Sequence, residues 1–154
     1  MDLRRQFASS VSLLPHFRAS AATFSFPIAV LIAIASRETN IRNIVGDGGH
    51  GHGLMQVDNR VLKGSEILAS KRTWLIHNQS KQLHVGKRIF KGRGFRTADE
   101  ILCVAIAGYN CGETCAYYHF STSGNPDLGT TGRDYSADVL KRAAIFSRLL
   151  TPRA

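Results

Sequence analysis

The chain has 154 residues, with 20 lysines and arginines against 11 aspartates and glutamates, for a formal net charge of +9. This length fits one domain with a sizeable core, and no repeat or low-complexity segment is visible. The charge favours a polyanionic partner: nucleic acid, an anionic membrane or an acidic cell-wall polymer. Nucleic acid ranks last because no nucleic-acid-binding motif is present. The plainer alternative is a basic surface that only aids solubility.

The first 36 residues predict one short helix, a connection and a buried core helix. Arg18 interrupts the N-terminal pattern too early for the apolar part of a secretory signal, so no signal peptide is expected. Residues 28–35 are densely apolar, but a membrane span needs about 20 such residues. We therefore expect no membrane insertion and a core helix whose first turn holds Ser25 and Pro27 and which ends near Glu38.

A glycine-rich loop follows this helix. The segment "VGDGGHGHG", residues 45–53, predicts a loop because glycine suits positive φ and close backbone approach. Residues 54–58, "LMQVD", predict a short extended stretch. Residues 62–85 predict a helix, and residues 86–96 form a basic, glycine-rich connector.

A capping pattern predicts the next helix. Thr97 and Glu100 have the spacing of a capping box, and apolar residues continue to Ala107. The segment "GYNCG", residues 108–112, is expected to break this helix.

Two further helices complete the prediction. The segment "ETCAYYHF" predicts a short helix, and a loop covers residues 121–133. The last helix has apolar residues at helical spacing: Val139, Ala143, Phe146 and Leu150. The chain is thus predicted to be mainly α, with a small extended element, in a single domain covering residues 1–154.

Three carboxylates near the glycine loop are candidates for catalysis. If the core helix holds, Glu38 shares a face with Leu31, Ile34 and Ala35, and lost hydration should raise its pKa. A carboxylic acid protonated near neutral pH suits a general acid. The plainer alternative is a glutamate that ends a helix and reaches water.

Asp47 and Asp58 flank the loop. Cleavage of a glycosidic bond needs a proton for the leaving oxygen and a carboxylate that activates water or stabilises the sugar cation. The glycines would let a sugar chain lie close to the backbone, so the loop and its carboxylates together suggest a glycosidase.

Other chemistries fit this segment less well. "GDGGHG" matches the dinucleotide fingerprint G-x-G-x-x-G, but it follows a helix instead of a strand. His50 and His52 lie in a loop without a helical i, i+4 pair, so they are expected to face solvent or contact sugar instead of binding metal. We expect no metal and no cofactor.

The three cysteines give no disulfide framework. Cys111, Cys115 and His119 are spaced by four, but on one helix they span about 12 Å, too far for one zinc ion. We interpret the cysteines as buried or bystander thiols, and whether Cys111 and Cys115 pair is left open.

Three elements in this order resemble one known family. "SRET…GDGGHGHGLMQVD", "AGYNCG" and "GTTGRDYSADVLKRA" are similar to motifs of goose-type lysozymes and the related soluble lytic transglycosylases. The resemblance covers residues 28–144.

The resemblance implies an α-helical lysozyme-like fold, with a small β element beside the active-site cleft, that cleaves peptidoglycan between N-acetylmuramic acid and N-acetylglucosamine. Glu38 matches the family's catalytic acid, and Asp47 and Asp58 match the pair thought to position water. Hydrolysis, with inversion, is therefore favoured. The residues expected to bind substrate are His50, Met55, Gln56, Tyr109, Asn110 and Tyr135. The plainer alternative for each tyrosine is a core aromatic with a hydrogen-bonded tip.

Two alternatives stay open: a lytic transglycosylase forming 1,6-anhydro products, and a non-catalytic wall-binding module. The sequence departs from the family in a shorter loop between Glu38 and Asp47 and in Thr39, where serine is frequent. With no signal recognised, export is expected through a phage lysis system or a specialised secretion machine. In the second case the enzyme is an antibacterial effector, and a cognate immunity protein is expected to plug its cleft. The unbound chain is expected to be a monomer.

Overall fold

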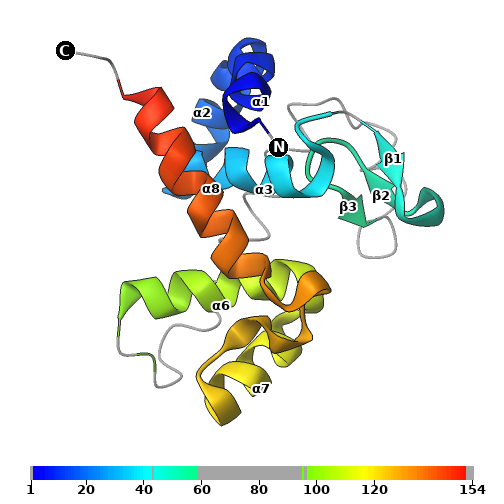
Figure 1. Ribbon diagram of the computed structural model, residues 1–154, viewed down its shortest axis with the longest axis vertical. Coiled ribbons are helices and arrows are strands. Elements are labelled where there is room, and N and C mark those ends of the chain that lie inside the picture. Colours follow the sequence, from blue (N-terminus) through cyan, green and yellow to red (C-terminus); the bar gives the residue numbers. More distant parts are fainter. Residues whose placement is uncertain (1, 43, 59–94, 96, 152–154) are drawn as a thin grey trace. The chain divides into compact units, whose positions relative to one another are not determined.

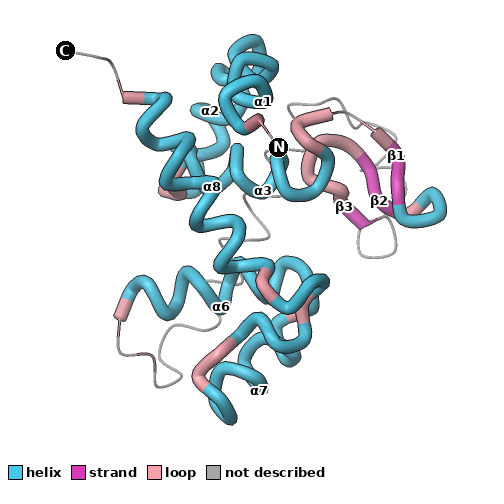
Figure 2. Tube along the Cα trace, viewed as in Figure 1, coloured by secondary structure: helices cyan, strands magenta, loops and turns pink. Residues whose placement is uncertain are grey.

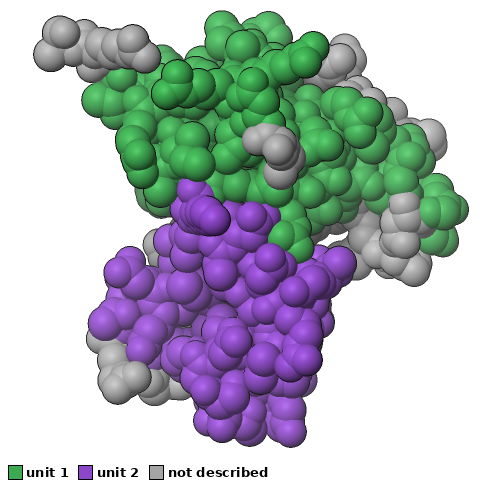
Figure 3. Space-filling view, in the orientation of Figure 1, with its two compact units in different colours: residues 1–80, 142–154 green, residues 81–141 purple. Residues whose placement is uncertain are grey.

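The computed structural model of this chain describes residues 2–42, 44–58, 95 and 97–151 (Figure 1). The predicted helix at 62–85 and nearly all of the basic connector at 86–96 lie outside the described residues. Within the described part, the chain is mainly helical, as predicted, with one small sheet (Figure 2). It divides into two compact units: unit 1, residues 1–80 and 142–154, and unit 2, residues 81–141 (Figure 3). Each unit is described by itself.

Unit 1 begins with two helices. Helix α1 (Leu3–Ser10) and helix α2 (Leu14–Phe24) are joined by a 3-10 turn, η1 (Val11–Leu13). The prediction of one short helix was therefore wrong. Pro15 lies in the first turn of the second helix, where the missing proline N–H breaks no helical hydrogen bond, so the helix accommodates it.

Helix α3 (Ile28–Thr39) is the buried core helix that the sequence predicted. It begins directly after Pro27, whereas Ser25 ends α2 in the left-handed conformation, with φ 51°. Asn40 and Ile41 also have positive φ, 53° and 59°, and they turn the chain away from the helix axis. Among the described helices, none is long and apolar enough to cross a membrane.

A three-stranded antiparallel sheet follows α3 (Figure 2). Its strands are β1 (Val45–Gly46), β2 (Gly51–His52) and β3 (Val57–Asp58). The extended stretch predicted at 54–58 was too long, because residues 53–56 form the turn between β2 and β3. Gly53 and Gln56 have φ of 78° and 50° at the two ends of this turn.

The core of unit 1 combines α2, α3, the β2–β3 turn and the second half of α8 (Tyr135–Leu150), the helix that runs across the boundary between the units. The Phe7 and Phe146 rings stack with centroids 6.2 Å apart. The largest fully buried side chains of this unit are Phe17, Leu31, Ile32, Ile34, Leu54, Met55 and Phe146.

Unit 2 contains α6 (Ala98–Cys111) and α7 (Glu113–Ser123). Thr97 caps α6 as predicted, since its Oγ1 accepts from the Glu100 N–H at 3.2 Å. The helix continues four residues past Ala107, so the predicted break at 108–112 was placed too early: it falls at Gly112, where φ is 91°. A small apolar cluster forms the core of this unit: Val104, Ala107 and Ala116, with Phe95, Cys111, Tyr117 and Phe120 packed against it.

Two 3-10 turns, η3 (Pro126–Gly129) and η4 (Thr131–Arg133), lie within the predicted loop and lead to α8. Val139, Ala143 and Phe146 are buried along α8, as their spacing predicted.

Candidate functional site

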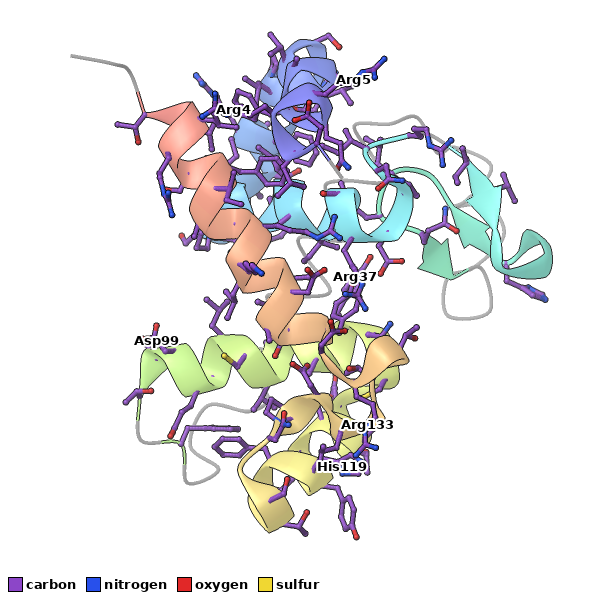
Figure 4. The ribbon with its side chains drawn as sticks, in the orientation of Figure 1. Arg4, Arg5, Arg37, Asp99, His119 and Arg133 are labelled. Carbon is purple, nitrogen blue, oxygen red and sulfur yellow. The ribbon has the colours of Figure 1, made fainter. Side chains whose placement is uncertain are left out.

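Glu38 lies in the last turn of α3 and is half-buried. The three residues that share its helix face, Leu31, Ile34 and Ala35, are fully buried, as the helical spacing predicted. Its neighbour Arg37 projects from the same turn and is labelled in Figure 4. The acid candidate therefore stands where an apolar helix leaves the core.

Thr39 connects this end of α3 to the sheet. Its Oγ1 lies 2.8 Å from the Leu54 carbonyl oxygen and 3.2 Å from that of Ala35, and either oxygen can accept its single proton. The same oxygen accepts from the Arg42 N–H at 3.0 Å. Because Leu54 belongs to the β2–β3 turn, this buried hydroxyl joins the helix that carries Glu38 to the turn that precedes Asp58.

A chain of hydrogen-bonded polar groups, which starts at the buried Arg142 and Ser36 and ends at the exposed Asn40, lies at the same end of α3. Arg142, 8% exposed, donates from Nη1 to Ser36 Oγ at 2.7 Å. Ser36 Oγ donates to Gln6 Oε1 at 2.6 Å, and Gln6 Nε2 donates to Asn40 Oδ1 at 3.3 Å. These bonds join α1 and α8 to the last turns of α3. They have no local sequence signal, because Arg142 and Ser36 are 106 positions apart.

Asp47 and Asp58 are placed by the sheet backbone. Asp47 opens the 3-10 turn η2 (Asp47–Gly49) between β1 and β2, and Asp58 ends β3. Gly46 of β1 pairs with Gly51 of β2, and Gly51 pairs with Asp58 of β3. These three residues therefore form one row of cross-strand partners. The two aspartates and Glu38 thus belong to one unit of the chain.

Glycine suits the loop positions for two different structural reasons. Gly48, Gly49 and Gly53 have φ of 61°, 96° and 78°, which favours glycine. Gly46 and Gly51 do not have positive φ, but a Cβ at either would overlap the Gln56 side chain. The sequence interpretation, that these glycines make room for a sugar, missed this internal use of the space.

Three predicted substrate residues lie in the same segment. His50 is half-buried, and Met55 is fully buried with 0% exposure. Gln56 is half-buried and donates from Nε2 to the carbonyl oxygens of Ile44 at 3.0 Å and Gly53 at 2.9 Å. Their contacts with substrate stay predictions, and the burial of Met55 gives that prediction no support.

The other three predicted substrate residues belong to unit 2. Tyr109 is half-buried on α6, and Tyr135 begins α8 with only 1% exposure. Asn110 Oδ1 accepts from the Thr131 N–H at 2.9 Å, and its Nδ2 donates to Thr131 Oγ1 at 3.4 Å. Asn110 therefore holds the end of α6 to η4, which was not anticipated.

Asp127 is a buried carboxylate that the sequence reasoning missed. Its Oδ1 accepts from the Ser136 N–H at 2.8 Å, and its Oδ2 accepts from Ser136 Oγ at 2.9 Å and the Ala137 N–H at 3.0 Å. A carboxylate at this position satisfies N–H groups that have no partner inside the helix and complements the helix dipole. Asp127 thus fixes the start of α8, nine positions away, beyond the reach of a local capping pattern.

The cysteines of unit 2 are free. Burial and a side-chain hydrogen bond to Cys115 raise the pKa of the Cys111 thiol to about 12. Burial, followed by the charge of Asp127, raises the pKa of Cys103. His119, labelled in Figure 4, follows Cys115 by one helical turn of α7. Within the described residues no three histidines, cysteines or acidic groups are arranged to hold a metal ion.

Comparison with known proteins places this chain in a family. The family model for lysozyme g matches residues 15–149. The chain therefore belongs to the lysozyme g family, and its fold is the mainly α, lysozyme-like fold that the sequence predicted.

Individual relatives agree with this assignment. The chain is 33% identical over 124 residues to lysozyme g of Struthio camelus, covering 78% of this chain and 58% of the relative. It is 34% identical over 132 residues to lysozyme g of Gallus gallus, covering 78% and 56%. It is 32% identical over 133 residues to lysozyme g of Cyprinus carpio, covering 77% and 63%. The match thus spans less than two thirds of each of these relatives.

Proposed function

We propose that this chain is a peptidoglycan-cleaving glycoside hydrolase, a muramidase acting on the β-1,4 bond between N-acetylmuramic acid and N-acetylglucosamine. Membership of the lysozyme g family supports this activity. The observation that carries the proposal is the connected element from α3 to β3. It places a half-buried glutamate at the end of an apolar helix and ties that helix, through Thr39, to the sheet that holds Asp47 and Asp58.

In the proposed reaction Glu38 protonates the glycosidic oxygen as the bond breaks. Asp47 and Asp58 position and activate a water molecule on the opposite face of the sugar, which gives inversion at the anomeric carbon. Glu38 is half-buried beside fully buried apolar residues, at the end of the helix that precedes the sheet. His50, Tyr109 and Asn110 remain candidates for contacts with the glycan, whereas the burial of Tyr135, like that of Met55, gives such a contact no support.

A lytic transglycosylase is the second candidate. In that reaction the 6-hydroxyl of muramic acid attacks instead of water, and no carboxylate pair is needed. The presence of both Asp47 and Asp58 favours hydrolysis. Mass spectrometry of digested peptidoglycan distinguishes the two: free reducing ends are expected for the muramidase, and 1,6-anhydro ends would establish the transglycosylase. If the glycan strands stay intact after prolonged digestion, the non-catalytic wall-binding module is the remaining alternative.

The biological setting is a further part of the proposal. The net charge of +9 suits an anionic wall. As an antibacterial effector or phage lysis enzyme, the protein would act on the wall from the periplasm or outside, and an effector would have an inhibitor that blocks its site. Purification from the native host tests this. A stoichiometric partner that suppresses lysis is expected, and the absence of such a partner would contradict the proposal of a cognate inhibitor.

A further inference from the structure

The half-buried side chain of Gln56 bonds to the segments next to β1 and β2. Its backbone is in the left-handed region, with φ 50°, which directs the chain out of the β2–β3 turn. From there the carboxamide Nε2 donates both of its hydrogens, to the Ile44 carbonyl oxygen at 3.0 Å and the Gly53 carbonyl oxygen at 2.9 Å. Ile44 immediately precedes β1, and Gly53 follows β2. One side chain therefore joins the segments that flank these two strands.

The amide oxygen of Gln56 lies over one face of the Gly46–Gly51 pair. A Cβ built on Gly46 would lie 2.6 Å from Gln56 Oε1, and one built on Gly51 would also overlap this oxygen. Gly46 and Gly51 face each other as a pair in the β1–β2 register. Because neither has positive φ, the obstacle to a side chain at either position is the Gln56 carboxamide, which would have to move and give up its hydrogen bonds.

A sheet with strands of two residues needs such support. Isolated short strands are marginally stable in water, and a slip of one residue would reverse the face of every side chain. The bond from the Gly53 N–H to the Ile44 carbonyl oxygen, 2.9 Å, closes the same corner. The Ile44 carbonyl oxygen therefore accepts from both the Gly53 N–H and the Gln56 carboxamide.

We propose that Gln56 is a positioning residue for the proposed reaction: its carboxamide holds β1, β2 and their connecting turns in one register, and so fixes the backbone positions of Asp47 and Asp58. Asp47 directly follows Gly46, and Asp58 pairs with Gly51. Both aspartates thus stand next to a glycine that Gln56 contacts. This inference rests on the proposed function, since the aspartates matter there as the water-positioning pair.

The same geometry argues against Gln56 as a contact for sugar. Both amide hydrogens are used inside the protein, and the oxygen lies against two glycines. A sugar hydroxyl could accept from Gln56 Nε2 only by displacing one of these two bonds.

A double-mutant cycle on the full chain tests the packing without any assay of activity. Gly51→Ala alone should lower Tm by roughly 5 °C, because its Cβ overlaps Gln56. In the Gln56→Ala background the same change should lower Tm by less than half as much, because the overlapping atoms are gone. Alanine at position 56 keeps the backbone restriction of glutamine, so the cycle isolates the side chain.

Gly48→Ala is the matched control in the same loop. A Cβ there meets no atom within 4 Å, and the cost arises from φ 61° alone. Its effect should be equal in both backgrounds. If Gly51→Ala lowers Tm equally in the two backgrounds, the Gln56 side chain does not pack against Gly51 as proposed. If Gly51→Ala does not fold, recovery of folding in the Gly51→Ala, Gln56→Ala double variant supports the proposal, and failure of that double variant contradicts it. Gly46→Ala, combined with Gln56→Ala in the same way, gives an independent second cycle.

Kinetics on soluble, uncross-linked peptidoglycan strands test the positioning role. Gln56→Ala and Gln56→Glu should lower kcat by roughly tenfold or more while KM changes by less than about twofold, because misplaced catalytic groups affect the reaction more than binding. A raised KM with unchanged kcat would make Gln56 a substrate contact and overturn the proposal. If the wild-type chain releases no product, the proposed function fails, and the stability cycle still decides whether Gln56 supports the sheet.

Discussion

Thr39 Oγ1 lies 2.8 Å from the carbonyl oxygen of Leu54, fifteen positions further along the chain. This buried contact is a direct side-chain link between the end of α3 and the β2–β3 turn. Thr39 directly follows Glu38, and Leu54 precedes Asp58 by four positions. The contact therefore links the segment of the proposed acid to that of one proposed water-positioning aspartate.

Thr39→Val should weaken this link while keeping the shape of the side chain. The hydroxyl is lost beside the Leu54 carbonyl and the Arg42 N–H, and such losses cost about 1–3 kcal/mol of unfolding free energy. Urea denaturation measures this cost, and Thr39→Ser, which keeps the hydroxyl, is the control. Equal stabilities of the valine and serine variants would show that the hydroxyl does not hold the turn.

Glu38→Gln should reduce wall lysis by at least about 100-fold, because an amide cannot donate the proton that the leaving oxygen needs. Turbidity loss of a cell-wall suspension measures lysis. Glu113→Gln, at the exposed start of α7, is the matched control and should retain activity. Normal lysis by the Glu38 variant, with an unchanged thermal melt, would remove Glu38 from the mechanism.

Ser36→Ala should destabilise the chain through the polar network that joins Arg142, Ser36, Gln6 and Asn40. Arg142 Nη1 would lose the Ser36 oxygen as an acceptor and Gln6 Oε1 would lose the Ser36 hydroxyl as a donor, at a cost of about 1–3 kcal/mol. Ser9→Ala is the control, because Ser9 is exposed and bonds to Arg5 of its own helix; its effect should stay within about 0.5 kcal/mol. Denaturation curves that do not separate the two variants would contradict a stabilising role for the network.

Asp127→Ala should loosen the start of α8. Three donors, two of them backbone N–H groups, lose their carboxylate, so we expect a cost of about 2–4 kcal/mol. Hydrogen exchange should accelerate at the Ser136 and Ala137 amides. Asp99→Ala, at the exposed first turn of α6 (Figure 4), should cost less than about 1 kcal/mol. Unchanged protection of the two amides would exclude Asp127 as the cap of α8.

The raised pKa of Cys111 predicts a loss of stability in alkali. In the unfolded chain this thiol ionises near the ordinary cysteine pKa of 9.0, whereas in the folded chain its pKa is about 12. Between these values the unfolded state binds fewer protons, so the contribution is fully present below about pH 9 and is lost as pH rises towards 12. Thermal melts from pH 8 to 11 should fall less steeply for Cys111→Ala than for the wild type. Parallel curves would contradict this.

The amino-acid sequence alone determined the class of the protein and its candidate catalytic residues. The apolar spacing around Ile34 and the lack of charge from 19 to 36 identified α3, and the order of the three motifs identified the family. These features are local, because helical periodicity and motif spacing are properties of neighbouring residues.

The tertiary structure decided what each polar residue contacts. Gln56 appeared in sequence as a cleft residue, yet its carboxamide lies over the Gly46–Gly51 pair, where a side chain on either glycine would meet it. Ser36 bonds to Arg142 across 106 positions, and Asp127 caps a helix that begins after it. Such contacts escape sequence reasoning because hydrogen bonds form wherever folding brings a donor to an acceptor, and the distance between them in the chain carries no record of it.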